Sequence, residues 1–187
     1  MIASIFRGYV VELIGKTVKL RYANIGDAEF IHSLRVDPLR NSHVSAVAGG
    51  IENQRKWLET YKSREFAGTE HYFIIELEGN AIGTVRIYDI QGDSFCWGSW
   101  MMKPGAPASC AMESAVLIYE FAFYSLGFAR SHFDVRKANS RVVAFHQRFG
   151  ASIVRESDVD FFFDYPKSAY DKVRTKYKKF IAADRPA

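Results

Sequence analysis

The sequence FCWGSWMM, residues 95–102, is an apolar run that predicts a buried strand. The segment KPGAPA, residues 103–108, follows it and is rich in the Pro, Gly and Ala that favour a tight turn. Next, SCAMESAVLIYEFAFYSL, residues 109–126, predicts a long apolar helix that ends at Gly127. The rest of the chain is arranged around this strand, turn and helix.

A second strand and a second helix complete the unit. RSHFDVRKAN, residues 130–139, predicts the strand and a turn, and SRVVAFHQRFGA, residues 140–151, predicts a helix closed by Gly150. Unpaired N–H groups and a partial positive charge at the start of the first helix favour an anion such as phosphate. The alternative interpretation is a turn that simply leads into a core helix. The small residues that would let an anion approach the backbone are Ala106, Ala108, Ser109, Cys110 and Ala111.

The other segments add strands and helices on both sides of this unit. An alternating strand at 17–22 leads into a helix that Asn24 or Asp27 caps. That helix ends at Asp37, because the residue before a proline avoids helical geometry. The remaining segments are an ambiguous stretch at 1–15, a loop at 44–50, a helix at 51–66, a β-hairpin of 71–77 and 81–90, strands at 152–157 and 159–165, and a basic helix at roughly 167–182.

The order of these elements, β-α-α-β-β-β-α-β-α-β-β-α, defines the fold class. Antiparallel strands come first, and a βαβ unit comes in the second half. This order predicts an α+β fold with a mixed, twisted sheet and helices on both of its faces. No linker, repeat or low-complexity run divides the 187 residues, so we expect a single domain over 1–187 with its core at 17–165.

The composition argues against several classes of partner. A net charge of +4 and a pI of about 9.0 suit anionic small molecules but are too weak to predict nucleic-acid binding. Two cysteines make no disulfide framework, which favours a cytoplasmic location. No apolar run is long enough to span a bilayer, so no membrane partner is expected. The five histidines are scattered without metal-ligand spacing, so no metal is expected.

The segment 95–151 resembles the cofactor-binding core of the GCN5-related N-acetyltransferase (GNAT) superfamily, and the element order over 17–165 resembles its fold. At this turn the superfamily carries the pattern R/Q-x-x-G-x-G/A, which holds the pyrophosphate of coenzyme A. Counted back from FAF at 121–123, the pattern falls on APASCA at 106–111, with small residues at both glycine positions and alanine at the basic one. The resemblance implies a mostly antiparallel sheet with a splayed central strand pair, and acetyl-CoA or another short acyl-CoA as co-substrate.

The second helix carries a further match to the superfamily, in which an Asn begins this helix and Tyr-x-x-x-Gly-Phe ends it. Asn139 and FHQRFGA at 145–151 match that pattern. The resemblance therefore places His146 at the usual Tyr, the general acid that protonates the departing thiolate. A histidine with no catalytic role is the alternative interpretation of the residue alone. The residues assigned to the cofactor are Met102, Ala108, Ser109, Cys110, Ala111, Met112, Asn139 and Arg148.

The base that deprotonates the acceptor amine is left open among several candidates. Many family members carry a Glu on the strand before the turn, but residues 95–100 contain no carboxylate. Glu76 and Asp89 lie on the neighbouring predicted strands and could act through water, and His71 is a third candidate. Ordered water alone is also sufficient where binding supplies proximity. The alternative interpretation of each carboxylate is a surface ion pair.

The segment LRVDPLRN, residues 34–41, resembles part of the acceptor pocket of bacterial amino-sugar N-acetyltransferases in this superfamily. The resemblance implies a nucleotide-linked amino sugar as acceptor, as in the synthesis of bacterial surface polysaccharides such as the lipopolysaccharide O-antigen. Arginines can bind a diphosphate bidentately, and aromatic rings can stack on a base or a sugar. Ion pairs and core packing are the alternatives. The expected acceptor-binding residues are Arg35, Arg40, Asn41, Trp57, His71 and Trp97.

Two other functions are compatible with the sequence. One is acetylation of protein N-termini, as in ribosomal-protein acetyltransferases, and the other is binding of coenzyme A without catalysis. The sequence leaves open the acyl group, the sugar, the nucleotide and the oligomeric state, a homo-oligomer included.

Overall fold

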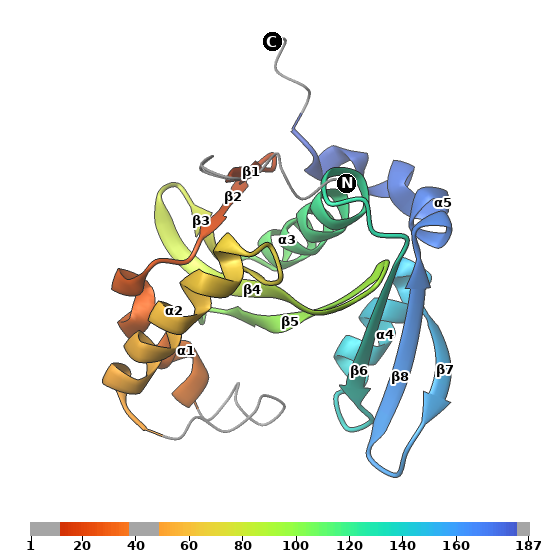
Figure 1. Cartoon of the computed structure of the whole chain (residues 1–187). Coiled ribbons are helices and arrows are strands. Elements are labelled where there is room, and N and C mark those ends of the chain that lie inside the picture. Colours follow the sequence, from red (N-terminus) through yellow and green to blue (C-terminus); the bar gives the residue numbers. More distant parts are fainter. Residues whose placement is uncertain (1–11, 38–48, 183–187) are drawn as a thin grey trace.

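A computed structural model describes residues 12–37 and 49–182 of the chain. The described strands join in one sheet of eight, with β1 and β7 at its edges (Figure 1). The strands are β1 (Glu12–Ile14), β2 (Val18–Tyr22), β3 (His71–Leu77), β4 (Asn80–Gln91), β5 (Ser94–Met102), β6 (Arg130–Arg136), β7 (Ser152–Glu156) and β8 (Asp160–Pro166). Their order across the sheet is β1-β2-β3-β4-β5-β6-β8-β7. Of these neighbours only β5 and β6 run parallel, which confirms the predicted mixed, mostly antiparallel α+β fold.

The parallel pair is short and opens into a V. Its residues pair only at Ser94↔Arg130 and Phe95↔Ser131, and beyond these positions β5 and β6 diverge (Figure 1). The sheet is thus divided into a half of β1 to β5 and a half of β6, β8 and β7. This is the predicted splayed central strand pair, and it creates an opening at the middle of the sheet.

Helices cover both faces of the sheet. The helices are α1 (Ala28–Val36), α2 (Ile51–Phe66), α3 (Ala108–Glu120), α4 (Ser140–Phe149) and α5 (Lys167–Tyr177). One face carries α1 and α2, whose Ile31 and Leu58 are buried with Ile74 of β3 (Figure 1). The other face carries α3, α4 and α5 over a larger core that includes Phe73 and Ile75. The alternation of β3 residues between the two cores is what strand geometry requires.

Local signals in the sequence end several elements where the predictions put them. Asn24 caps the 3₁₀ turn η1 (Ile25–Asp27) by accepting a hydrogen bond from the Gly26 N–H, and α1 follows directly. Asp37 ends α1 in an extended conformation, as the residue before a proline should. Gly150 closes α4 at a φ of 96°, in the left-handed region that favours glycine.

Two predicted helices end differently in the structure. The long helix expected at 109–126 is α-helical only to Glu120 and continues as a π-helical turn, η3 (Phe121–Ser125), in which the Leu126 N–H donates to the Phe121 carbonyl at 2.9 Å. The wider turn keeps Phe121 and Phe123 buried. The last helix ends at Tyr177 and continues as a 3₁₀ turn, η4 (Lys178–Phe180). Residues 44–48 of the expected loop lie outside the described residues.

Candidate active site

The backbone of β5 is irregular where the strand moves away from β6. The register with β4 shifts between Thr84↔Met101 and Arg86↔Gly98, and Ser99 has a φ of 47°. The Thr84 hydroxyl donates to the Ser99 carbonyl at 2.8 Å and holds the bulge in place. Bulges of this kind redirect the backbone and are frequent beside active sites.

The N-terminus of α3 lies at a cavity of about 410 Å³ next to this bulge. The helix begins at Ala108 after Pro107, and no side chain caps it among the described residues. Its first N–H groups therefore offer an uncapped, partially positive surface for an anion. The lining residues are Trp100, Met101, Met102, Lys103, Gly105, Ala106, Pro107, Ala108 and Ala111, with Arg141 and Val142 of α4.

The cavity gathers part of the predicted cofactor set. Met102, Ala108 and Ala111 line it, and Ser109 is exposed beside them. Asn139 caps α4 and accepts from the Val142 N–H at 3.4 Å, so it lies beside a lining residue. The other predicted residues lie elsewhere: Cys110 is buried, Met112 packs against the core, and Arg148 is exposed in the last turn of α4.

Arg141 is a cavity residue that the sequence analysis missed. It follows Asn139 by two positions, in the first turn of α4, and is exposed. A guanidinium at this place can bind a phosphate bidentately. The sequence carries no local sign of this role, because residue 141 meets residues 100–111 only through the packing of α4 against β5.

His146 occupies the interior of the V on the face of α3 and α4. The side chain is 5% exposed, and its ring centroid lies 4.2 Å from that of Phe133 on β6 and 5.5 Å from that of Trp97 on β5. Burial lowers the pKa of His146 to about 3, so the imidazole is neutral at pH 7. Its Nδ1 is buried and has no hydrogen-bond partner among the described residues. A buried, unpartnered nitrogen between the diverging strands fits a ligand that enters the V.

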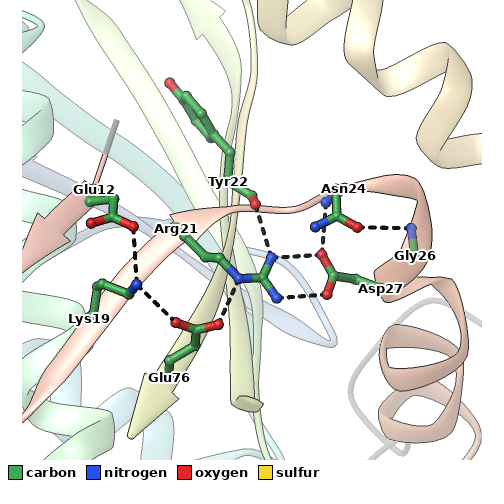
Figure 2. A network of polar contacts seen from close by, with 8 residues as sticks. All are labelled: Glu12, Lys19, Arg21, Tyr22, Asn24, Gly26, Asp27 and Glu76. Carbon is green, nitrogen blue, oxygen red and sulfur yellow. Dashed lines mark hydrogen bonds and ion pairs between the residues drawn. The ribbon is translucent and has the colours of Figure 1, made fainter. Parts of the chain in front are cut away.

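Glu76, one of the candidate bases, belongs to a network of ion pairs (Figure 2). Its carboxylate lies 2.6 Å from Arg21 Nε and 3.3 Å from Lys19 Nζ. The Arg21 guanidinium also binds both oxygens of Asp27 at 2.8 Å, and Lys19 reaches Glu12 at 3.0 Å (Figure 2). The network joins β1, β2 and β3 to the start of α1, which gives Glu76 a structural role.

His71 and Asp89, the other candidate bases, differ in exposure. His71 is 4% exposed, its Nδ1 lies 2.7 Å from the Tyr22 hydroxyl, and burial lowers its pKa to about 4. Asp89 is exposed, and hydrogen bonds from Gln91 and His132 lower the pKa of its carboxyl. Its Oδ2 lies 3.2 Å from His132 Nε2. Whether any of the three serves as the base stays a prediction.

The predicted acceptor residues other than His71 come from separate parts of the chain. Trp57 on α2 lies at the surface of the sheet, where the guanidinium groups of Arg64 and Arg86 approach its ring at 5.1 and 5.3 Å. Trp97 is buried in the core and donates to the Tyr119 hydroxyl at 3.0 Å. Arg35 lies in the last turn of α1. Arg40 and Asn41 lie outside the described residues.

Comparisons with known proteins agree with this architecture. The profile of the Acetyltransferase (GNAT) domain matches residues 17–152. A solved structure described as apo FdhC, a nucleotide-linked sugar GNAT, is 40% identical, with a TM-score of 0.85 over 93% of this chain and 100% of that chain. A GCN5-related N-acetyltransferase from Brucella melitensis is 17% identical, with a TM-score of 0.75 over 92% and 86% of the two chains. A spermidine N-acetyltransferase from Vibrio cholerae, solved with CoA and spermine, is 18% identical, with a TM-score of 0.71 over 82% and 98%. No curated protein matches the chain.

The fold and the comparisons together define an N-acyltransferase. The chain belongs to the GNAT acetyltransferase family, which confirms the resemblance, and enzymes of this family use acyl-CoA. None of the helices in the described ranges has the length and apolar character needed to cross a membrane. Within the same ranges, no group of three or more His, Cys, Asp or Glu side chains could hold a metal ion.

Proposed function

We propose that this protein transfers an acetyl or other short acyl group from acyl-CoA to the amine of a nucleotide-linked amino sugar. The observation that carries the proposal is the 40% identity to apo FdhC, a nucleotide-linked sugar GNAT, over 93% of this chain and all of the other. A setting in bacterial surface polysaccharide synthesis, such as that of the O-antigen, is part of the same proposal. We infer a cytoplasmic enzyme in which the whole chain forms one unit, and a homo-oligomer is compatible with it.

The cavity at the start of α3 fits the diphosphate of coenzyme A. The amides of Ala108 and Ser109 precede the regular hydrogen bonds of α3, since the Cys110 N–H is the first to bond back, to the Pro107 carbonyl at 3.0 Å. Arg141, in the first turn of α4, lines the same cavity and adds a positive charge. Anion binding by uncapped helix amides together with a guanidinium is favourable. Acyl-CoA supplies an activated thioester, and the residues of the chain hold and orient it.

His146 is the residue that we assign to the sulfur of the co-substrate. At neutral pH its imidazole is uncharged, with a pKa of about 3, so it would approach the leaving sulfur as a neutral N–H donor rather than as a stored imidazolium. The unpartnered Nδ1 and the position between Trp97 and Phe133 support this assignment. A hydrogen bond to a leaving thiolate lowers the barrier because the charge develops in the transition state.

A surface on the α1 and α2 side of the sheet is suited to the acceptor. The guanidinium of Arg86 on β4 stacks on Tyr88 at 4.3 Å and faces Trp57 at 5.3 Å. Arg64 lies over the same tryptophan, and both arginines pair with the buried carboxylate of Glu70. Arginines and aromatic rings in one place suit a diphosphate joined to a base or a sugar. Arg35, Arg40 and Asn41 are proposed to extend this surface.

Release of free thiol from acetyl-CoA tests the proposal directly. We expect thiol release with thymidine- or uridine-diphosphate-linked amino sugars, and not with N-terminal peptides or spermidine. His146→Phe should lower kcat by about 10²-fold, the usual scale of proton-donor loss, while the protein stays folded. If only the peptides release thiol, the proposed sugar acceptor is wrong and the acceptor is a protein N-terminus. A shift in melting temperature with acetyl-CoA but no thiol release with any amine would indicate a non-catalytic binding protein.

A further inference from the structure

Three polar side chains from three neighbouring strands lie in a line at the closed end of the V. Ser94 Oγ on β5 is 2.6 Å from His132 Nδ1 on β6. The other ring nitrogen of the same imidazole, Nε2, is 3.2 Å from Asp89 Oδ2 on β4. Hydroxyl, imidazole and carboxylate are therefore connected in one hydrogen-bonded chain, and the sequence analysis proposed only the carboxylate for a catalytic role.

The line lies where β5 and β6 separate. Their pairing ends at Phe95↔Ser131, and His132 is the next residue of β6. Phe95 faces the α3 side of the sheet, where its ring centroid is 5.6 Å from that of Phe123 in η3, so Ser94 faces the other side. The same alternation puts Phe133 against His146 and turns His132 to the opposite face. The serine and histidine thus border the V on the side of α1 and α2, across the sheet from His146.

The position of Asp89 is fixed by the backbone rather than by chance contact. It has a φ of 48°, a conformation that costs free energy for any residue other than glycine, at an irregularity of the β4–β5 register. Gln91 Nε2 donates to the same carboxylate oxygen at 2.9 Å. Non-glycine residues held in such a conformation gather at functional sites, where the surrounding structure supports them.

The charge of Asp89 determines the tautomer of the ring. A carboxylate accepts hydrogen bonds and cannot donate, so Nε2 must carry the proton that is shared with Asp89. In the neutral ring, Nδ1 then has a free electron pair and accepts from the Ser94 hydroxyl. This arrangement leaves the imidazole ready to receive a proton through Ser94, with the carboxylate placed to stabilise the imidazolium that forms.

We propose that His132 accepts, by way of the Ser94 hydroxyl, the proton that the acceptor amine loses, and that Asp89 is the positioning residue of this relay. The inference rests on the proposed N-acyltransfer and names the base that it requires. Glu76 is held by Arg21 and Lys19, and His71 lies on the α3 side in the core, 5.4 Å from Phe121 between ring centroids. The candidate bases were Glu76, His71 and Asp89. Of these, Asp89 alone is connected, through His132 and Ser94, to the point where β5 and β6 separate.

Acyl transfer moves the proton of the acceptor amine along this relay. The nitrogen lone pair forms the new C–N bond to the thioester carbonyl carbon, and the C–S bond breaks with its electron pair on sulfur. The N–H proton of the attacking amine passes to Ser94 Oγ, whose own proton passes to His132 Nδ1. The products are the amide, a thiolate that takes up a proton, and an imidazolium that returns its proton to solvent.

Several charged groups surround the imidazole of His132. Asp134 lies two residues further along the same face of β6, and Asp164 of β8 is the cross-strand neighbour of His132. Arg130 lies two residues before His132 on β6, and its guanidinium pairs with Asp164 at 3.7 Å. Together with Asp89, these groups place three carboxylates and one guanidinium around the ring.

Nitrogen NMR of the histidine rings in the free protein tests the geometry without any substrate. We expect neutral His132 to carry its proton on Nε2, and Asp89→Asn or Ser94→Ala to change the ring signals of this histidine alone. A proton on Nδ1 in the wild-type protein would overturn the relay, because Ser94 would then accept from the ring instead of donating to it.

Thiol-release kinetics test the chemistry. We expect His132→Gln and Ser94→Ala to lower kcat about 10²- to 10⁴-fold while the affinity for acetyl-CoA is unchanged. In Asp89→Asn the ring loses the carboxylate that fixes its tautomer, so kcat should also fall while the affinity for acetyl-CoA is unchanged. His32→Gln on α1 is the matched control and should behave as wild type.

A small primary amine at high concentration serves as a second acceptor in all variants. If this amine is acylated and the nucleotide-linked sugars are not, the proposed substrate is wrong while the relay is still measured. If His132→Gln and Ser94→Ala keep the wild-type kcat with either acceptor, the relay is wrong and the proposed function stands.

Discussion

Glu113 shows how one buried charge can determine the path of the chain. The residue lies on α3 and is 1% exposed. Its carboxylate accepts from the N–H groups of Thr17 at 2.7 Å and Val18 at 3.0 Å, and also from the Thr17 hydroxyl. A Cβ on Gly15 would lie 2.1 Å from Glu113 Oε1, so a larger residue there would displace the carboxylate from its place. The carboxylate thus anchors the start of β2 to the central helix.

Removal of this carboxylate should be costly. Glu113→Ala leaves two backbone N–H groups without an acceptor in a buried place, and we expect a loss of about 2–4 kcal/mol in the free energy of unfolding. Urea denaturation followed by circular dichroism measures it. Glu59→Ala, at an exposed position of α2, is the control and should change stability by less than about 0.5 kcal/mol. A similar small change in Glu113→Ala would show that water replaces the carboxylate at these N–H groups.

Residue types alone identified part of the site but not its connections. The small residues Ala108 and Ala111 were predicted beside the cavity because anion binding at a helix N-terminus has a local signature. Ser94 and His132 were missed because they are 38 positions apart and meet only through the register of β5 and β6. The Arg21–Glu76 ion pair joins residues 55 positions apart and has no local signature either.

At the scale of elements, most helices and strands follow from periodicity, and the exceptions have physical causes. The strand at 71–77 and the helix at 51–66 occur with the predicted bounds, since each has a clear apolar pattern and a turn signal at its ends. The π-helical turn at Phe121–Ser125 was not predicted, because an all-apolar segment gives no sign of a wider hydrogen-bond pattern. The bulge at Ser99 depends on the Thr84 side chain of the neighbouring strand.

The start of α3 offers a test in which stability and binding should change in opposite directions. Ala108 is the exposed first residue of the helix, so Ala108→Glu places a negative charge at the positive end of the helix dipole. We expect the free protein to gain about 0.3–1 kcal/mol in stability. The same carboxylate should repel the diphosphate of acetyl-CoA.

Isothermal titration calorimetry should therefore show an increase of at least about tenfold in the Kd of acetyl-CoA for Ala108→Glu. Ala108→Gln, which has nearly the same size and no charge, is the matched control and separates repulsion from steric blocking. An unchanged Kd in the glutamate variant would mean that acetyl-CoA phosphates do not approach these amides.

At the scale of the whole molecule, the two halves of the sheet are held together by the core beneath them rather than by the sheet. Only two residue pairs join β5 to β6. Aromatic contacts connect the halves instead, since the Tyr119 ring of α3 lies 5.5 Å from Trp97 of one half and 5.0 Å from Tyr165 of the other, between centroids. Because this aromatic core connects the two halves of the sheet, a ligand can enter between β5 and β6 without separating the halves.

Two buried histidines lie on the α3 side of the sheet and link the stability of the molecule to pH. Burial lowers the pKa of His71 to about 4 and that of His146 to about 3, whereas an unfolded histidine titrates near 6.5. Below pH 6.5 the unfolded chain therefore binds up to two protons that the folded chain does not bind at these rings. The stability of the folded protein therefore decreases as the pH falls below 6.5, and it continues to decrease until the folded rings titrate.

We expect the free energy of unfolding to fall by up to about 1.4 kcal/mol per pH unit for each of the two rings between pH 6 and pH 5, a range above the titration of most carboxyl groups. Urea denaturation at pH 7, 6 and 5 measures this slope. In His146→Phe one of the two rings is gone, so the slope should decrease by about half. If His146→Phe kept the wild-type slope, the imidazole would have to gain its proton in the folded protein as easily as in the unfolded chain, and the dry aromatic surroundings of this ring would not exist in solution.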